Sequence, residues 1–283
     1  MVTGANAGIG LLTCLELAEA GFDVIGTARS AEKAEVVQRA AHDRGLALRT
    51  VELEVDDAEA CAAVAAQVAG MTGGGPWGLV NNAGFAQSGA VEDVSDELVR
   101  AQLETNLVAP LRLARLFLPA MRARGDGRIV NISSIAGRLA APLLGWYSAS
   151  KHALEGVTDA LRVEVAPDGV RVVLVEPGMF ATDVWSAAQD GGYPPASTPR
   201  YAAAYARSAA LAGHSRKLQD PVWVARTVRV ALTHPRPLAR YMVGADAVAG
   251  LTAHSVLPTA VTDLVKSVTT GLRPLPSWRQ RPR

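Results

Sequence analysis

Short apolar runs alternate with amphipathic segments along most of this chain. The runs have the length of strands and are rich in Val, Ile and Leu, which is typical of strands buried on both faces of a parallel sheet. They predict strands at 22–28, 46–55, 76–84, 127–134, 169–178 and 240–244. Segments with helical periodicity lie near 31–44, 57–69, 95–123, 146–166 and 221–233. Pro110 predicts a kink in the helix at 95–123.

This alternation defines the fold class. Repeated strand–helix–strand units imply right-handed crossovers, so the sequence predicts an α/β protein with a Rossmann-like, doubly wound parallel sheet and helices on both faces. We expect a single domain over residues 1–272. Residues 179–220 break the rhythm with a Gly- and Pro-rich loop, and residues 273–283, with three prolines and four arginines, predict a disordered tail.

The composition excludes several classes of function. Of the 283 residues, 49% are apolar and 19% charged, which is typical of a globular chain with a sizeable core. A net charge of +1 gives no basis for nucleic acid as the main partner. The two cysteines and five histidines show no disulfide or metal-ligand spacing, so we expect no metal site.

The chain shows no apolar run long enough to cross a bilayer and no basic-then-apolar leader. We therefore expect a cytoplasmic protein with no integral membrane segment. Residues 251–272 are fairly apolar, but charged residues interrupt them. For this stretch we favour ordinary packing over a helix that lies on a membrane surface.

Glycines mark the first turn of the chain. Gly4, Gly8 and Gly10 open an amphipathic helix that leads to the next strand. Glycine permits positive φ and, without a Cβ, lets phosphate oxygens approach the amides at a helix N-terminus, so a dinucleotide site is favoured over a plain turn. Only Met1 and Val2 precede the motif where a central strand belongs. We expect either that the true start lies several residues upstream or that a short stub suffices.

A second candidate site lies in "GWYSASKHALEG", residues 145–156, where Tyr147 precedes Lys151 by four residues. On a helix, both side chains share one face. A nearby ammonium favours the phenolate and is expected to lower the tyrosine pKa, which would make the phenol useful for proton transfer. The alternative is a half-buried tyrosine beside a solvated lysine.

Four separated motifs occur together in one order. They are "TGANAGIG" at 3–10, "NNAG" at 81–84, "NISS" at 131–134 and "YSASK" at 147–151. With these motifs the chain resembles the classical short-chain dehydrogenases/reductases over residues 3–245. Its "EPG" turn is similar to the one that meets the nicotinamide in that family, and the later segment 236–258 resembles the subgroup of 17β-hydroxysteroid and retinol dehydrogenases.

The resemblance implies a set of catalytic residues. Tyr147 would act as general acid in carbonyl reduction and as general base in alcohol oxidation, while Lys151 would lower its pKa and hold the nicotinamide ribose. Ser134 would hydrogen-bond the reacting oxygen, and Asn106 would support a water-linked proton path through Lys151. Ser133 is the alternative to Ser134. Successive strand residues point to opposite faces, and we favour Ser134.

The resemblance also implies a nicotinamide cofactor, which supplies the hydride. Its binding residues would be Gly4, Asn6, Gly8, Ile9, Gly10, Glu54, Val55, Asn82, Ala83, Gly84, Tyr147, Lys151, Pro177, Gly178 and Thr182. Glu54 stands where the family often has Asp. NAD-binding members usually carry an acidic residue at the end of the second strand. Here Ala28 and Arg29 occupy that place, so we favour NADP, with NAD as the alternative.

In this family the stretch after "EPG" covers the substrate, which here means residues 179–220. The stretch contains Met179, Phe180, Val184, Trp185 and Tyr193. We therefore expect a lipophilic alcohol or carbonyl substrate. The alternative function is a nucleotide-sensing protein without turnover, and the intact Ser, Tyr, Lys and Asn set argues against it. Family members commonly form homo-oligomers through helices that correspond to 95–123 and 146–166, and we expect the same here.

Overall fold

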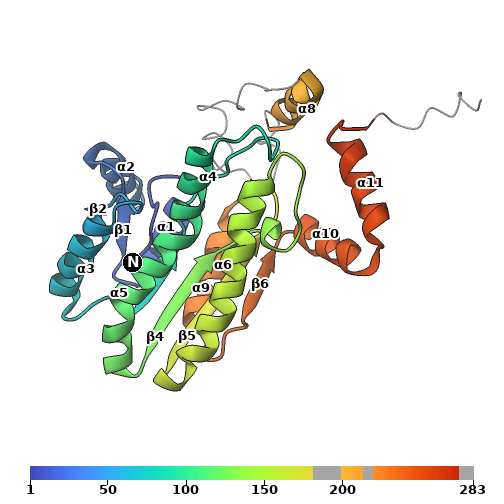
Figure 1. The fold of residues 1–283 in the computed structure, drawn as a ribbon. Helices are drawn as coiled ribbons and strands as arrows, with labels where there is room; N and C mark the ends of the chain where they lie inside the picture. Colours follow the sequence, from blue (N-terminus) through green and yellow to red (C-terminus); the bar gives the residue numbers. More distant parts are fainter. Residues whose placement is uncertain (181–198, 213–218, 274–283) are drawn as a thin grey trace, which may run out of the picture.

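A parallel β-sheet forms the centre of the molecule (Figure 1). The computed structural model describes residues 1–180, 199–212 and 219–273. The strands are β1 (Ile25–Ala28), β2 (Arg49–Glu52), β3 (Gly78–Asn81), β4 (Gly127–Ile132), β5 (Val170–Pro177) and β6 (Arg240–Val243). β1 pairs with β2, and β3 to β6 pair in sequence order, all in parallel. Each strand falls within a range that the sequence predicted.

Val2 joins the two groups of strands. It forms parallel bridges to Gly26 of β1 and to Val80 of β3. The amide of Val2 donates to the carbonyl of Ile25 at 2.9 Å, and the amide of Thr3 donates to the carbonyl of Val80 at 3.0 Å. The residues that precede the glycine turn thus occupy the central position that the doubly wound fold requires.

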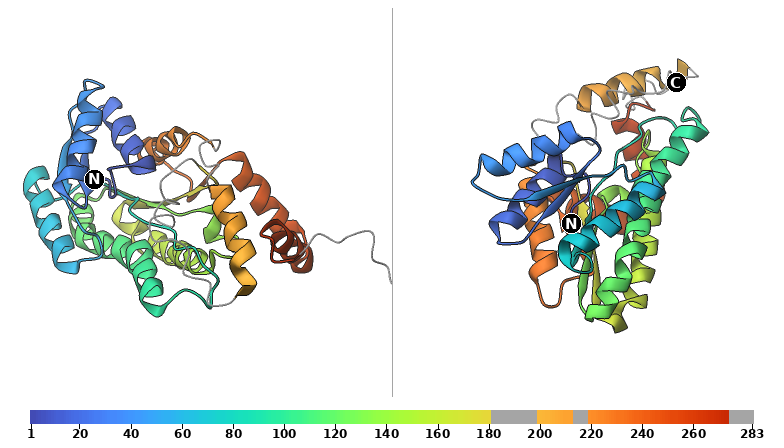
Figure 2. Two further views of the ribbon diagram at one scale, coloured as in Figure 1. Left: turned by 90° about the horizontal axis from the view of Figure 1, so that it is seen from above. Right: turned by 90° about the vertical axis from the view of Figure 1, so that its left-hand side faces the viewer.

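Helices cover both faces of the sheet (Figure 2). The helices α1 (Gly8–Glu19), α2 (Ala31–His42) and α9 (Val222–Thr233) lie on one face, and α3 (Ala58–Thr72), α5 (Ala109–Arg124) and α6 (Gly145–Glu164) lie on the other. Each face has its own apolar core, one packed between α1, α9 and the strands and the other between α3, α5 and the strands. The fold is the Rossmann-like doubly wound sheet that the sequence predicted.

The long helix predicted at 95–123 is divided. It consists of α4 (Asp96–Leu103), a π-helical turn (Glu104–Val108) and α5. Pro110, where we expected a kink, is the second residue of α5 and follows this wide turn. A π-turn shifts the helix face locally and often marks a functional site. Here it contains Asn106.

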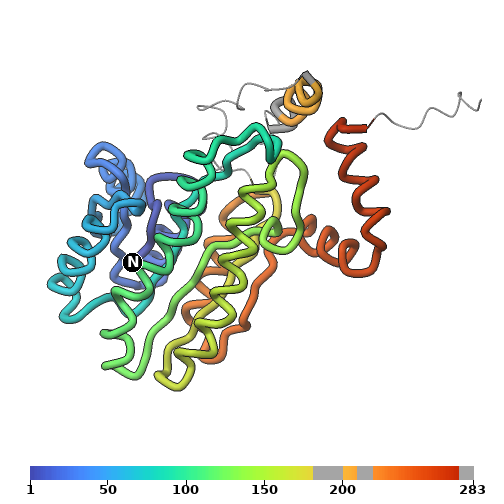
Figure 3. The backbone as a smooth tube through the Cα atoms, viewed as in Figure 1, coloured from blue at the N-terminus to red at the C-terminus, as the bar shows by residue number. Residues whose placement is uncertain are grey.

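The remaining elements lie at the edge of the molecule. Short 3-10 turns span Ile135–Gly137, Ala166–Asp168 and Pro199–Tyr201. The helices α8 (Ala202–Ala212), α10 (Ala245–Val256) and α11 (Thr259–Thr269) lie outside the sheet, and α11 is the most peripheral of them (Figure 3). Residues 181–198, 213–218 and 274–283, which include most of the predicted substrate-covering segment and the predicted tail, fall outside the described residues.

No helix among the described residues combines the length and the apolar character needed to cross a bilayer.

Candidate active site

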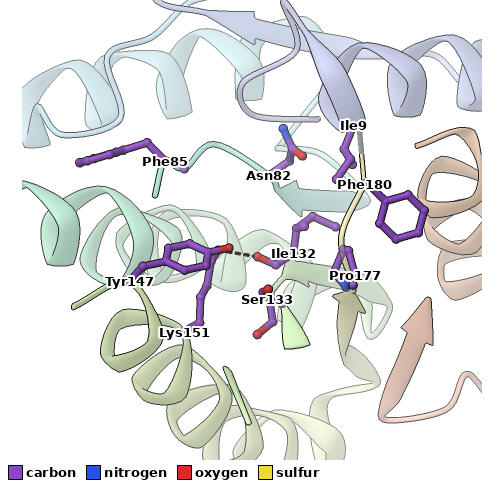
Figure 4. A pocket seen from close by; sticks show the side chains of 12 residues that line it. Ile9, Asn82, Phe85, Ile132, Ser133, Tyr147, Lys151, Pro177 and Phe180 are labelled. Atoms are coloured by element: carbon purple, nitrogen blue, oxygen red, sulfur yellow. Dashed lines mark hydrogen bonds between the residues drawn. The ribbon is translucent and has the colours of Figure 1, made fainter. Parts of the chain in front are cut away.

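A cleft opens at the carboxyl ends of the central strands (Figure 4). Ligands bind at this edge of doubly wound sheets, because the loops that leave the strands meet there. The residues that line it come from α1 and from the ends of β3, β4, β5 and α6: Ile9, Asn82, Gly84, Phe85, Ile132, Ser133, Ser134, Tyr147, Lys151, Pro177, Gly178 and Phe180. Motifs spread over most of the chain therefore meet in one place.

The glycine turn forms one wall of this region. Gly4 and Gly8 have φ values of 63° and 52°, which favour glycine. A Cβ on Gly10 would lie 2.1 Å from the carbonyl oxygen of Gly4, so no side chain fits there. The side-chain Nδ2 of Asn82 donates hydrogen bonds to the backbone carbonyls of Thr3 at 2.9 Å and Gly4 at 3.2 Å, and these bonds connect the turn to the end of β3.

The start of α1 is suited to an anion. Its N-cap, Ala7, makes no side-chain hydrogen bond, and its first turn carries no acidic residue. Amides at a helix N-terminus, together with the helix dipole, favour a phosphate group. Asn6 is half-buried just before the helix, and Ile9 faces the cleft. The residues present thus fit the pyrophosphate of a dinucleotide.

Tyr147 lies on the first turns of α6 and is buried. Burial raises the pKa of its phenol above the ordinary value, and a hydrogen bond with Ser134 opposes that rise. We expected the opposite direction, with Lys151 lowering the tyrosine pKa. The lysine Nζ lies 6.0 Å from the centre of the Tyr147 ring, and in this structure desolvation of the phenol has the larger effect.

Lys151 is held from the other side of the cleft. Its Nζ donates a hydrogen bond to the backbone carbonyl of Ile132 at 2.8 Å, shown as the dashed line in Figure 4. Burial lowers the pKa of the ammonium to about 8, and the negative charge of Glu155 acts in the opposite direction. At neutral pH the lysine is therefore still a cation, fixed beside Tyr147.

The two serines after β4 have different surroundings. Ser134 accepts a hydrogen bond from the amide of Ala136 at 3.1 Å and interacts with Tyr147. Ser133 Oγ has no hydrogen-bond partner among the described residues, and a Cβ on Gly137 would meet it at 2.7 Å. Both serines line the cleft, but only Ser134 is linked to the phenol by these contacts.

Asn106 is buried in the π-turn and connects the loop after β3 to α6. Its Nδ2 donates to the carbonyl of Phe85 at 3.0 Å and to Ser150 Oγ at 3.1 Å. Ser150 Oγ in turn donates to the carbonyl of Tyr147 at 2.7 Å. A Cβ on Gly84 would lie 2.9 Å from Asn106 Oδ1, which explains why a glycine follows Ala83.

The turn after β5 is held by a residue that sequence reasoning did not identify. Asp246, in the first turn of α10, accepts hydrogen bonds from the amide of Met179 at 2.6 Å and from Gln219 Nε2 at 2.5 Å. A Cβ on Gly178 would lie 2.4 Å from both carboxylate oxygens of Asp246, so only glycine fits there. The predicted Thr182 falls outside the described residues.

The predicted adenosine-side residues lie further along the same edge of the sheet. Arg29 follows the last residue of β1 and is exposed. Glu54 is exposed two residues after β2, whereas Val55 is buried in the core on the α3 and α5 face. These three residues do not line the cleft that holds Tyr147.

Two buried carboxylates, Glu155 and Glu176, form a group of charges with the half-exposed Arg240 and the exposed Arg138, and this group was not expected from the sequence. Arg240 Nε lies 3.1 Å from Glu176 Oε1 and 3.1 Å from Glu155 Oε2, and Arg138 Nη1 lies 3.6 Å from Glu176 Oε2. Burial and the neighbouring Glu155 raise the pKa of Glu176 to about 7, while Arg138 and Arg240 oppose the rise. The only feature of the sequence that indicated this group was Glu176, the acidic residue of the "EPG" turn.

The fold and the cleft together define a nicotinamide-dependent oxidoreductase. Comparison with known proteins narrows this class of enzyme to one family. Residues 1–193 match the family model described as short chain dehydrogenase. The chain belongs to the short-chain dehydrogenase family, and these findings favour turnover over the alternative of a nucleotide sensor.

Several relatives match nearly the whole chain. The NADPH-dependent 3-dehydrocapnine reductase of Ornithobacterium rhinotracheale is 32% identical over 271 residues, covering 94% of each chain. Human retinol dehydrogenase 5 is 33% identical over 279 residues, covering 93% of this chain and 86% of its own. Among solved structures, a short-chain dehydrogenase from Streptomyces avermitilis superposes with a TM-score of 0.76 at 34% identity, covering 95% of both chains.

Proposed function

We propose that this protein is an NADP(H)-dependent oxidoreductase that interconverts a lipophilic alcohol and its carbonyl partner, with Tyr147 as the residue that moves the proton. One observation carries the proposal: the Tyr147 phenol, linked to Ser134 and beside the Lys151 ammonium, shares a cleft with Ile9 of the glycine motif. The cofactor, when bound, gives or takes the hydride. The chain's own side chains must then supply or remove a proton at the reacting oxygen.

The protonation states favour carbonyl reduction at neutral pH. The raised pKa keeps the Tyr147 phenol protonated, which is the form that donates to a carbonyl oxygen. Ser134 would donate a second hydrogen bond to that oxygen as negative charge develops on it. The Lys151 cation would stabilise the phenolate that remains, and Asn106 would hold α6 in place through Ser150.

The cofactor preference is proposed from the end of β1. Ala28 stands where an acidic residue would otherwise hold the ribose hydroxyls of NAD, and the exposed Arg29 follows it. A guanidinium forms paired hydrogen bonds with a phosphate, so it suits the 2′-phosphate of NADP. The reductase from Ornithobacterium rhinotracheale, by its name, uses NADPH.

The substrate class is proposed from the apolar part of the cleft. Phe85 and Phe180 are among the residues that line the cleft that holds Tyr147. An apolar cleft with a few polar groups at one point suits a lipophilic molecule that carries a single reacting oxygen. Retinol dehydrogenase 5, by its name, acts on such an alcohol. The predicted lining residues Val184, Trp185 and Tyr193 fall outside the described residues.

A panel of lipophilic aldehydes and ketones, followed by the loss of NADPH absorbance, tests this function. We expect turnover of at least one member, and faster turnover with NADPH than with NADH. If the protein binds NADPH in a fluorescence titration but consumes none across the panel, the nucleotide-sensing alternative is supported instead.

We also propose a cytoplasmic homo-oligomer. Cys14 and Cys61 are free thiols, which is usual in a reducing compartment. Exposed apolar side chains on α4, α5 and α6, namely Leu98, Leu116, Val157 and Val163, support an interface on the helices that the family uses. Light scattering after size exclusion tests the oligomeric state, and a monomer at all concentrations would contradict it.

A further inference from the structure

Three buried carboxylate oxygens, on α6 and on β5, accept no hydrogen bond from any described residue. They are Glu155 Oε1 and both oxygens of Glu176. The helix α6 packs on β5, whose neighbour in the sheet is β6 (Figure 1). Buried polar atoms of folded proteins nearly always have partners, so these three oxygens need an explanation.

The guanidinium of Arg240, on β6, does not supply the missing donor. Its Nε lies 3.1 Å from Glu155 Oε2 and 3.1 Å from Glu176 Oε1, but this nitrogen carries one hydrogen, which it donates to Glu155. Its Nη2 donates to Asp159. Arg138 Nη1 lies 3.6 Å from Glu176 Oε2, which is too far for a hydrogen bond. Glu176 therefore has two cations nearby and no donor.

A proton held between the two carboxyl groups would supply that donor. A protonated carboxyl carries an O–H group, which can donate to an oxygen of the other carboxylate. Glu155 and Glu176 lie against the same nitrogen of Arg240, so they are immediate neighbours. Two carboxylates in one buried site resist ionising together, because each charge raises the cost of the other. Burial and the charge of Glu155 raise the pKa of Glu176 to about 7, in agreement with this geometry.

The hydroxyl of Ser133 lies at the same group. The Ser133 amide donates to the carbonyl of Val175 at 2.8 Å, which places Ser133 beside Glu176 on the neighbouring strand, with both side chains on one face. Ser133 Oγ is buried and has no partner among the described residues. A Cβ on Gly137 would lie 2.7 Å from Ser133 Oγ and 3.2 Å from Glu155 Oε1, so both oxygens flank one point. The hydroxyl is therefore placed to donate to the carboxyl pair.

The carboxyl pair is next to Lys151. Glu155 follows Lys151 by four residues on α6, so the two side chains share a face of the helix. Burial lowers the pKa of the Lys151 ammonium, and the negative charge of Glu155 opposes this effect. The other charged groups around the pair are Asp159 on α6, Arg240 on β6 and Arg138 after the 3-10 turn at Ile135–Gly137. The charge of the pair thus acts on the cation beside Tyr147.

We propose that Glu155 and Glu176 share one proton at neutral pH, that Ser133 donates a hydrogen bond to them, and that the single negative charge they keep stabilises the Lys151 ammonium. Above neutral pH the shared proton leaves, and the second negative charge makes the ammonium harder to deprotonate. The consequence for catalysis rests on the proposed function, in which this ammonium assists Tyr147, whereas the shared proton itself does not.

Infrared spectroscopy of the full chain in heavy water tests the shared proton, because a protonated carboxyl has a carbonyl stretch that a carboxylate lacks. At about pH 6.5, where ordinary carboxyl groups are ionised, the wild type should show the band of one protonated carboxyl and lose it as the pH rises through about 7. Glu155→Gln and Glu176→Gln should each lose the band, because the glutamine amide donates to the remaining carboxylate. Glu164→Gln, at the exposed end of α6, is the matched control and should keep the band.

Two results of this titration would overturn the proposal. The first is the absence of the band in the wild type, a result that needs no variant and holds even where a substitution impairs folding. The second is a band that persists in Glu155→Gln or in Glu176→Gln, because the proton would then belong to one carboxyl group alone.

The role of Ser133 is tested by the pH at which the band disappears. A hydroxyl that donates to the pair favours its charged form, so Ser133→Ala should keep the band to a pH higher by about 0.5 unit or more. Ser134→Ala is the matched control, since Ser134 interacts with Tyr147 instead, and should not move the midpoint. An unchanged midpoint in Ser133→Ala would overturn the assignment of Ser133 to the pair.

Trace acetylation with acetic anhydride, read by mass spectrometry, tests the effect on Lys151, because only the neutral amine reacts. Glu155→Gln should label Lys151 about threefold faster or more at pH 7, since loss of the negative charge favours the neutral amine. Glu176→Gln should label it faster than the wild type at pH 8, where the wild-type pair carries two charges, and equally at pH 6. Lys33, on α2, is the internal control in each sample.

Equal labelling of Lys151 in Glu155→Gln and the wild type would overturn the link between the pair and the lysine. A difference between Glu176→Gln and the wild type that is the same at pH 6 and pH 8 would also overturn it. Both measurements are made without cofactor or substrate. The proposal can therefore fail in a protein that consumes NADPH normally and hold in one that consumes none, so its failure is distinguishable from failure of the proposed function.

Discussion

The ammonium of Lys151 donates a hydrogen bond to the backbone carbonyl of Ile132, the last residue of β4, at 2.8 Å. This bond ties α6, which carries Tyr147, to the strand end that leads into Ser134. The two hydroxyl groups proposed for proton transfer are therefore fixed relative to each other by one buried cation.

Tyr147→Phe should reduce kcat by about 100-fold or more, because the proton donor is removed while the shape of the side chain is kept. Binding of NADPH, measured by the change in tryptophan fluorescence, should remain close to that of the wild type. Tyr241→Phe is the control. Tyr241 accepts a hydrogen bond from the amide of Leu238 outside the cleft and should leave kcat unchanged. Normal turnover by Tyr147→Phe would remove the proposed role.

The rate of carbonyl reduction should fall as the pH rises through about 8, because burial lowers the pKa of Lys151 to about 8 and the cation is lost above it. The phenol titrates at higher pH, since burial raises its pKa above the ordinary value. Glu155 raises the lysine pKa, so Glu155→Gln should move the alkaline limb of kcat/KM to lower pH. Glu164→Gln, at the exposed end of α6, should not move it. If the alkaline limb of kcat/KM is not shifted in Glu155→Gln, a group other than Lys151 controls that limb.

The raised pKa of Glu176 predicts how the free energy of unfolding depends on pH. Its folded pKa is raised to about 7, so the folded protein holds this proton more tightly than the unfolded chain does. This tighter proton binding stabilises the folded protein. The stabilisation is fully present below the ordinary carboxyl pKa and is lost as the pH rises through about 7. Glu176→Gln should therefore be more stable than the wild type at pH 8, by roughly 1 to 3 kcal/mol, and the difference should shrink toward pH 5.

Thermal melts of wild type, Glu176→Gln and Glu164→Gln across this pH range measure the effect. The exposed Glu164 serves as the matched control, with no expected change in the slope. If Glu176→Gln is the less stable protein at pH 8, the ion pairs with Arg138 and Arg240 outweigh the cost of burying the carboxylate.

The strands and the placement of the motifs at the cleft were predictable because each depends on local sequence. The run at 169–178 became β5 (Val170–Pro177), and Tyr147 and Lys151 lie on one helix as their spacing required. The direction of the Tyr147 pKa was predicted wrongly. Spacing indicates that a lysine is near, whereas the cost of burying a phenolate depends on packing by distant segments.

The contacts that sequence reasoning missed join residues far apart in the chain. Asp246 and Met179 are 67 residues apart, and Arg240 and Glu155 are 85 residues apart. Neither pair has a spacing pattern that a single sequence reveals.

Asp246→Ala should weaken NADPH binding by about tenfold, because the turn at Gly178 and Met179 loses a charged hydrogen-bond acceptor at the edge of the cleft. Asp246→Asn keeps an acceptor for the Met179 amide and should retain more of the affinity. Asp43→Ala, at the exposed end of α2, is the control for loss of a carboxylate. If Asp246→Ala lowers the melting temperature but leaves the Kd for NADPH unchanged, Asp246 stabilises the fold but does not position the turn for cofactor binding.

Arg29→Ala should lower the affinity for NADPH by about 10- to 100-fold and leave the affinity for NADH nearly unchanged, because only NADPH carries the 2′-phosphate. Arg39→Ala is the matched control, since Arg39 is an exposed arginine in the last turn of α2. Titration of both cofactors against tryptophan fluorescence gives the two dissociation constants for each variant. A wild type that binds NADH more tightly than NADPH would reverse the cofactor assignment. An equal loss for both cofactors in Arg29→Ala would mean that the guanidinium contacts a part that NADH and NADPH share.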